Sequence, residues 1–218
     1  MVTAAVIFDM DGVLVDSEPF WHQAELKVFR ALGVPLEASM CLQTTGLRPD
    51  EVVRYWHERF PWPGDVKEAE RRVVDEVMRL VQAQGRARPG VAQALAWVGA
   101  LNVPLGIASS SPYRLIEAVC AKLGVRDVFS VIHSAEEEPL GKPHPGVYLN
   151  AAAKLKVSPT ACVAIEDSIN GIVAAKAARM TCLAIPEPEL LGDRRLGIAD
   201  LVLPSLERIA EAAALFGR

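Results

Sequence analysis

The chain has 218 residues, of which 51% are hydrophobic and 23% charged, and its net charge is −4. This length suffices for one sizeable core with a smaller lobe. The charge shows no basic surplus that would favour nucleic acid, and no apolar run approaches the ~18 residues of a membrane span. No signal peptide pattern opens the chain, and its four cysteines show no zinc spacing and suit a reducing compartment. We therefore expect a cytoplasmic protein without nucleic acid or membrane partners.

The first stretch, Ala4 to Phe8, is wholly apolar and predicts a parallel strand covered on both faces. Asp9 and Asp11 follow it, where ligands bind in open α/β sheets. Residues two apart in an extended chain point the same way, so both carboxylates can share one site. Their repulsion calls for a proton or a cation. The alternative is that both are solvated loop acids. Gly12 permits a sharp turn or a close approach to a bound group.

The next segment reads as helical throughout. Ser17 is placed to cap a first helix, and the expected helices span Glu18 to about Leu32, Asp50 to Phe60 and about Val66 to Gln84. So many helices before the second strand fit poorly with short crossovers. We therefore expect an all-helical domain at 17–86, inserted into a core domain formed by 1–16 and 87–218. The alternative is a set of ordinary helices flanking one sheet.

From Pro89 onward, strand and helix patterns alternate. The expected strands are Val103 to Ala108, Val128 to Ile132, Cys162 to Ile165, Thr181 to Ile185 and Asp200 to Leu203. The expected helices run to about Leu101 and over Tyr113 to Leu123, Val147 to Leu155 and Ile169 to Ala178, with a closing helix from Leu206. Repeated β-α units predict an α/β fold with a doubly wound parallel sheet and right-handed crossovers.

A polar group follows each of the predicted strands that carry the site. Besides the aspartate pair, these groups are Ser109, Lys142, Glu166 and Asp167. In a parallel sheet all of them converge on one edge. Taken singly, each has an ordinary explanation: Ser109 as a helix cap, Lys142 as a solvated loop lysine, and the two acids as exposed caps of the next helix.

The run Asp-x-Asp-Gly-x-x-x-Asp-Ser at 9–17 resembles the first motif of the haloacid dehalogenase (HAD) superfamily of phosphohydrolases. Ser109 resembles its second motif, Lys142-Pro143 its third and Glu166-Asp167 its fourth. The resemblance implies that Asp9 attacks phosphorus, that Asp11 is the general acid and base, and that Asp167 binds the metal. It places Glu166 and Asn170 beside the site in supporting roles, and it implies a helical cap inserted after the first strand.

This set of groups suits phosphoryl transfer. A phosphate dianion repels a carboxylate nucleophile, and one Mg²⁺ per chain between Asp9, Asp167 and a phosphate oxygen would reduce that repulsion. The backbone carbonyl of Asp11 is a further candidate ligand, and Mn²⁺ is a candidate substitute for the ion. Lys142 would add positive charge, and Ser109 could donate a hydrogen bond to phosphate. Asp11 would protonate the leaving alkoxide and then activate water.

Substrate choice should depend on the helical segment, because the core motifs contact only phosphate. Candidate substrate-binding residues are Gly12, Glu18, Trp21, His22, Thr45, Gly46, Arg48, Ser110 and Ser111. For Arg48 the default interpretation is a surface arginine, but the loop glycine Gly46 gives it a mobile approach.

The resemblance extends to the sugar-phosphate branch of the superfamily. The runs that carry it are Asp16 to Pro19, Tyr55 to Trp62, Ser109 to Pro112 and Lys142 to Pro145. They look most like 2-deoxyglucose-6-phosphate or hexitol-phosphate phosphatases, which implies a monomeric, Mg²⁺-dependent hydrolase of small sugar phosphates working through an aspartyl-phosphate. The alternatives are a β-phosphoglucomutase, a phosphoglycolate-type phosphatase, a dehalogenase and, more remotely, a receiver-like phosphoacceptor domain. Mutases of this group tend to carry a lysine at Pro112, which weakens the mutase interpretation.

Overall fold

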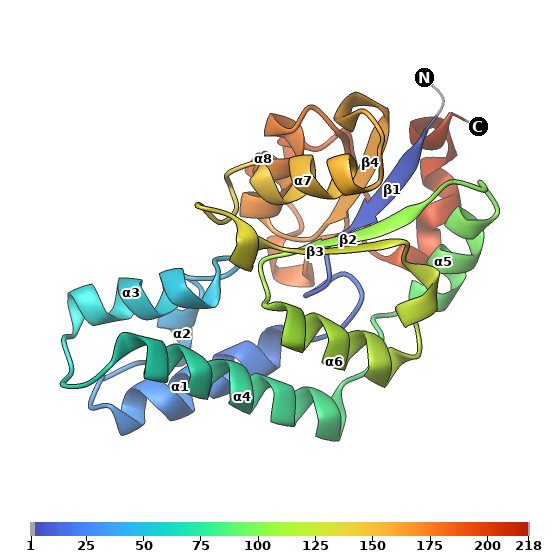
Figure 1. Ribbon diagram of the computed structural model, residues 1–218. Coiled ribbons are helices and arrows are strands. Elements are labelled where there is room, and N and C mark those ends of the chain that lie inside the picture. The colour runs from blue at the N-terminus through green and yellow to red at the C-terminus, as the bar shows by residue number, and fades with distance from the viewer. Residues whose placement is uncertain (1–2, 218) are drawn as a thin grey trace.

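The computed structural model describes residues 3–217, and a parallel sheet of six strands forms its centre (Figure 1). The strand order is β3-β2-β1-β4-β5-β6, and every neighbouring pair is parallel. The strands are β1 Ala5–Phe8, β2 Leu105–Ser109, β3 Val131–Ser134, β4 Cys162–Glu166, β5 Thr181–Ala184 and β6 Leu201–Val202. The predicted α/β fold with a doubly wound parallel sheet is confirmed.

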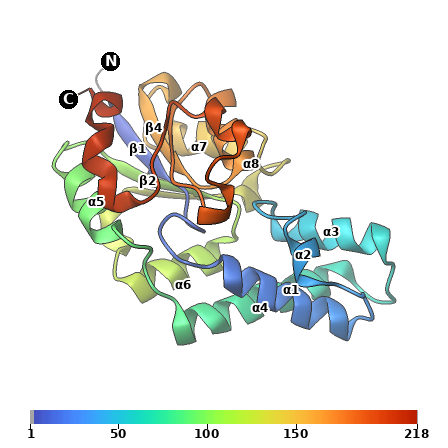
Figure 2. The same cartoon turned by 180° about the vertical axis from the view of Figure 1, so that it is seen from behind.

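Helices cover both faces of the sheet (Figures 1 and 2). The helices beside the sheet are α5 Val91–Gly99, α6 Tyr113–Leu123, α7 Gly146–Lys154, α8 Ile169–Ala177 and a 3₁₀ helix at Leu206–Phe216. Alternate residues of β1 enter two separate apolar cores: Val6 and Phe8 lie in the core that α5 and α6 share, and Ala5 and Ile7 in that of α7 and α8. β1 is therefore buried on both faces, as its unbroken apolar run predicts.

Register brings the strand ends to one level. Phe8 pairs with Ile107 of β2 on one side and with Ile165 of β4 on the other. The backbone N–H of Asp9 extends the ladder by donating to the Ile165 carbonyl at 2.9 Å. The residues that follow these paired positions, Asp9 after β1 and Glu166 at the end of β4, are therefore neighbours at the carboxyl edge.

Between β1 and β2 the chain is helical, apart from its connecting loops. The helices α1 Glu18–Ala31, α2 Ala38–Cys41, α3 Pro49–Arg59 and α4 Val66–Gln84 lie together at one side of the sheet (Figures 1 and 2). Trp56 is fully buried among their apolar residues. The domain limits at 17–86 stay a prediction, because the apolar core of these helices is continuous with that beneath β1.

The chain enters and leaves this helical segment at one place. Val15 forms an antiparallel bridge with Ala87. The N–H of Asp16 donates to the Arg86 carbonyl at 3.2 Å, and the N–H of Arg88 donates to the Leu14 carbonyl at 3.1 Å. The two connections therefore run side by side as a short two-stranded junction.

Two local predictions differ from the structure. Ser17 stands at the start of α1, but its hydroxyl makes no capping hydrogen bond and donates instead to Asp11. The third strand begins later than expected, because residues 126–128 form a 3₁₀ turn and pairing with β2 starts only at Val131. Among the described residues, no helix combines the length and apolarity that crossing a membrane requires.

Candidate active site

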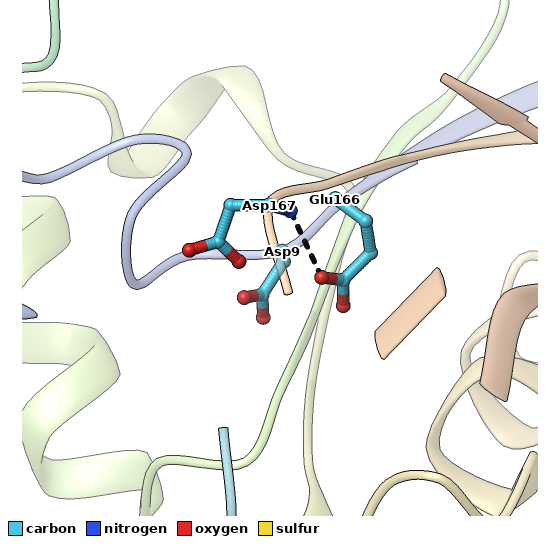
Figure 3. A group of neighbouring side chains, drawn as sticks. All are labelled: Asp9, Glu166 and Asp167. Atoms are coloured by element: carbon cyan, nitrogen blue, oxygen red, sulfur yellow. Dashed lines mark hydrogen bonds between the residues drawn. The ribbon is translucent and has the colours of Figure 1, made fainter. Parts of the chain in front are cut away.

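Three carboxylates gather where β1 and β4 end (Figure 3). Asp9, Glu166 and Asp167 each offer an oxygen within 4.8 Å of the others, and all three are buried. β1 delivers Asp9, while β4 delivers Glu166 and, one residue later, Asp167. The sheet register explains their meeting, since paired neighbouring strands stop at the same level.

Lys142 is the positive charge at this cluster. Its buried ammonium donates to Asp9 Oδ1 at 2.8 Å and to Glu166 Oε1 at 2.6 Å. The Tyr148 hydroxyl also donates to Glu166 Oε1, at 2.7 Å. The other Glu166 oxygen accepts from the backbone N–H groups of Asp167 and Ser168, at 3.0 and 3.2 Å. Glu166 therefore holds the lysine and the following loop in place.

Burial, together with neighbouring carboxylates, raises the pKa values of Asp9 and Asp167. Burial raises the pKa of Asp9 to about 7 against the pull of Lys142, and the Glu166 and Asp11 carboxylates add to the rise. Burial, then Glu166 and Asp9, raise the pKa of Asp167 well above its usual range. Burial also acts to raise the pKa of Glu166, but the Lys142 ammonium outweighs it and the net shift is downward. One ammonium therefore does not neutralise three carboxylates.

The donor set fits a divalent cation that prefers oxygen. Within the described part of the chain, no group hydrogen-bonds to the Asp167 carboxylate, and only Lys142 donates to that of Asp9. Both aspartates thus have oxygen lone pairs available, whereas Glu166 is fully occupied. Mg²⁺ is bound in proteins by one or two carboxylates, with waters and substrate phosphate completing the octahedron. The cluster can therefore hold this ion through Asp9 and Asp167.

Position 12 requires glycine because its backbone lies close to the Asp167 carboxylate. Its φ is +70°, and a Cβ there would lie 1.9 Å from Asp167 Oδ2. A side chain at position 12 would displace the Asp167 carboxylate. Gly12 acts on the cation site through the path of the loop and does not line the pocket described below.

Asp11 is held by three donors from two parts of the chain. Ser17 Oγ and Trp21 Nε1 donate to its Oδ1 at 2.6 and 3.0 Å, and Ser111 Oγ donates to its Oδ2 at 2.7 Å. Trp21 lies on α1, while Ser111 follows β2. The helical segment and the sheet thus both orient this carboxylate.

Ser109 ends β2 and is fully buried. Its Oγ accepts from the N–H of Ser111 at 3.0 Å, and it donates to no described group. The following helix α6 begins after Pro112, so Ser109 is not its cap. Its hydroxyl proton is used by no described group, but Ser109 does not line the pocket described below.

A pocket opens from this edge toward the helical segment. Asp9, Asp11, Lys142 and Asp167 form its floor. The sequence-predicted substrate residues that line it are Glu18, Trp21, His22, Thr45, Gly46, Ser110 and Ser111. Ser110 Oγ also donates to the Gly46 carbonyl at 3.3 Å, which joins the two walls.

Arg48 and Asn170 lie outside the pocket. Arg48 is buried, and its Nη1 donates to the carbonyls of Ala135 and Glu138 at 2.9 and 2.6 Å. Asn170 Nδ2 donates to the Thr45 carbonyl at 3.4 Å. In this arrangement both side chains fasten the loop before α3 to the sheet region.

Sequence reasoning missed several polar residues of the site, among them Glu25, Tyr148 and the pocket-lining Thr44 and Ser168. Glu25 lines the pocket and is buried. Its spacing could have found it, because Glu18, Trp21, His22 and Glu25 follow the pattern i, i+3, i+4, i+7 of one helix face. Tyr148, which supports Glu166, carries no such signal, since a tyrosine within an apolar helix usually serves packing.

Comparison with known proteins agrees with this geometry. A family model described as haloacid dehalogenase-like hydrolase matches residues 3–179. The chain therefore belongs to the haloacid dehalogenase-like hydrolases and is an enzyme of that class, as the four motifs predict.

Its relatives place it further within the family. Hexitol phosphatase B of Escherichia coli (strain K12) is 45% identical over 207 residues, which cover 94% of this chain and 93% of the relative. The phosphorylated carbohydrates phosphatase of Thermotoga maritima is 32% identical over 174 residues, 80% of this chain and 81% of the relative. The crystal structure of CbbY from Rhodobacter sphaeroides in complex with phosphate superposes with a TM-score of 0.83 at 29% identity, covering 95% of this chain and 96% of the other.

Proposed function

We propose that this enzyme is a Mg²⁺-dependent phosphatase that hydrolyses monophosphates of small sugars and hexitols through an aspartyl-phosphate at Asp9. The observation that carries the proposal is the buried cluster of Asp9, Glu166, Asp167 and Lys142 at the floor of the pocket. The similarity to hexitol phosphatase B along nearly the whole chain supports the substrate class.

Asp9 and Asp167, with the backbone carbonyl of Asp11, would hold the metal. When bound, Mg²⁺ supplies positive charge that offsets the repulsion between the nucleophile and the phosphate dianion. Lys142 adds a fixed positive charge beside Asp9, and Glu166 keeps the ammonium there. Ser109 donates a hydrogen bond to a phosphate oxygen. These groups stand in place before substrate binds, which lowers the cost of reorganisation.

Two steps complete the reaction. In the first, a carboxylate oxygen of Asp9 forms a bond to phosphorus, the ester P–O bond breaks, and the Asp11 carboxylic acid gives its proton to the leaving alkoxide. In the second, the Asp11 carboxylate takes a proton from water, the hydroxide oxygen bonds to phosphorus, and the bond to Asp9 breaks. Inorganic phosphate and free sugar are released, and both aspartates return to their starting forms.

A mutase would need the pocket to hold a bisphosphate in both orientations. Pro112 stands where mutases of this group tend to place a lysine, and here it is the residue before α6. Within the described residues, Lys142 is the one lysine that lines the pocket, and it is paired with two acids. These features favour hydrolysis over transfer to a second hydroxyl.

The direct test is phosphate release from sorbitol 6-phosphate and 2-deoxyglucose 6-phosphate. We expect turnover with Mg²⁺ and its loss with EDTA, restored by excess Mg²⁺. Asp9→Asn should lower kcat by at least about 10⁴-fold, because the amide cannot act as the nucleophile. Circular dichroism of the variant serves as the folding control. Turnover within tenfold of the wild type in Asp9→Asn would remove the aspartyl-phosphate from the mechanism.

A further inference from the structure

We propose that the pocket selects phosphate esters whose leaving group is uncharged and rich in hydroxyls, and that Glu25 on α1 is a specificity-determining residue that rejects a second negative charge. This inference rests on the proposed phosphatase function and narrows its substrate class.

Most of the charged residues that line the pocket are acidic. Its acidic lining residues are Asp9, Asp11, Glu18, Glu25 and Asp167. Against them stands Lys142, whose ammonium is already bonded to Asp9 and Glu166. The nearby cation Arg48 is engaged by the carbonyls of Ala135 and Glu138 and by Asp50. Among the residues that the structure describes, the arrangement therefore leaves no unpaired lysine or arginine at the far end of the pocket for a second phosphate or a carboxylate.

The residues that α1 contributes to the pocket wall also disfavour an anion. Glu18, His22 and Glu25 share one face of this helix. Glu25 is 4% exposed, and Thr44 Oγ1 donates to its Oε2 at 3.3 Å. Burial raises the pKa of Glu25 to about 7, although the hydrogen bond from Thr44 opposes the rise. When ionised, this side chain can accept a hydrogen bond from a hydroxyl, and its charge repels an anion.

Two residues that line the pocket each bury a polar atom without a partner among the described residues, which points to a ligand. His22 Nε2 and Thr45 Oγ1 have no hydrogen-bond partner among the described residues. The nearest acid oxygen to His22 Nε2, Glu18 Oε2, is 3.6 Å away. Buried polar atoms nearly always find a partner in proteins. A polyhydroxy chain can supply one to each, because every hydroxyl both donates and accepts.

The experiment compares two substrates that differ in one group. Sorbitol 6-phosphate and 6-phosphogluconate share an open six-carbon chain, but the latter ends in a carboxylate. We expect kcat/KM of the wild-type enzyme at pH 8 to favour sorbitol 6-phosphate by about 100-fold or more, since unpaired like charges brought together are strongly unfavourable. In Glu25→Gln, which keeps the shape and removes the charge, we expect this preference to fall by about tenfold, through faster turnover of 6-phosphogluconate.

Glu58→Gln is the matched control, because it changes the net charge equally at an exposed position of α3 outside the pocket. It should leave the preference unchanged. A wild-type enzyme that hydrolyses both substrates equally would overturn the inference and leave the proposed function standing, whether or not Glu25→Gln folds. An unchanged preference in a folded Glu25→Gln would overturn the role of Glu25. Absence of hydrolysis of any hexitol or sugar phosphate would overturn the proposed function and the inference together.

Discussion

The two ends of the pocket differ in how some of their polar groups are bonded. At the sheet edge, Lys142 and Glu166 are buried and bonded to each other and to neighbours. On the opposite wall, His22 and Thr45 each bury a polar atom that has no partner among the described residues. The first arrangement fits groups that act on every substrate in the same way. The second fits groups whose hydrogen bonds are completed only by a particular ligand, and it teaches where selectivity resides.

Replacing Lys142 at the sheet edge should have the largest effect on stability and on activity. Lys142→Met leaves the Asp9 and Glu166 carboxylates buried without their common partner. Deleting one member of a buried ion pair typically costs about 3–5 kcal/mol. We expect a loss of that size in urea denaturation at pH 7, and loss of measurable phosphate release.

Lys154→Met is the control for this variant. Lys154 is 40% exposed and pairs with an exposed Glu137, so its loss should cost less than about 1 kcal/mol. If the two variants lost equal stability, the buried contacts of Lys142 would contribute no more to stability than an exposed ion pair does.

Replacing Glu25 on the opposite wall should increase the stability of the protein, whereas replacing Lys142 should decrease it. Because burial raises the pKa of Glu25 from 4.5 to about 7, the folded state binds a proton that the unfolded state has already released. Stability is therefore lost as pH rises from about 4.5 to 7. Glu25→Gln removes this cost, and we expect the variant to be more stable than the wild type by about 3.5 kcal/mol at pH 8, given about 1.4 kcal/mol per pKa unit.

Urea denaturation at pH 4.5 and pH 8 measures this effect. At pH 4.5 the two proteins should differ little, because the wild-type carboxyl is then largely protonated when folded. A variant that is destabilised at both pH values would show that Glu25 serves packing alone. A gain limited to high pH would identify Glu25 as a functional residue kept at the expense of stability.

The smallest expected effect is a loss of kcat on replacing Trp21, which lies on α1 and hydrogen-bonds to Asp11 at the sheet edge. Trp21→Phe removes the indole donor to Asp11, while Ser17 and Ser111 remain. We expect kcat on sorbitol 6-phosphate to fall about tenfold, since a proton donor out of position is a poor general acid. On p-nitrophenyl phosphate, whose leaving group needs no proton, the loss should be smaller. Equal losses on both substrates would indicate a role in binding and not in proton transfer.

The sequence predicts one half of this site far better than the other. Asp9, Lys142 and Asp167 follow elements of a parallel sheet, so topology alone brings them to one edge. Arg48 shows the limit: it lies just before α3, yet its partners are backbone carbonyls of a 3₁₀ turn far along the chain. Backbone carbonyls carry no residue signature, so no pattern in the sequence could reveal these contacts.

Glu25 is an intermediate case. The spacing of α1 places it on the face of the predicted substrate residues Glu18 and His22 and so makes it a candidate, but spacing alone cannot show that this face meets the ligand. That depends on how α1 packs against α4 and the loop carrying Thr44, and therefore on the assembled structure.

The junction of residues 14–16 with 86–88 has a consequence for the history of such enzymes. The helical segment leaves and rejoins the sheet through two adjacent, hydrogen-bonded stretches of chain, so its two ends lie side by side. The corresponding segment of a related enzyme could replace it at this junction without changing the order of the strands in the sheet. Chimaeras cut there should exchange substrate preference while retaining the chemistry of the recipient, and gene recombination at the same place would give a short route to new specificities.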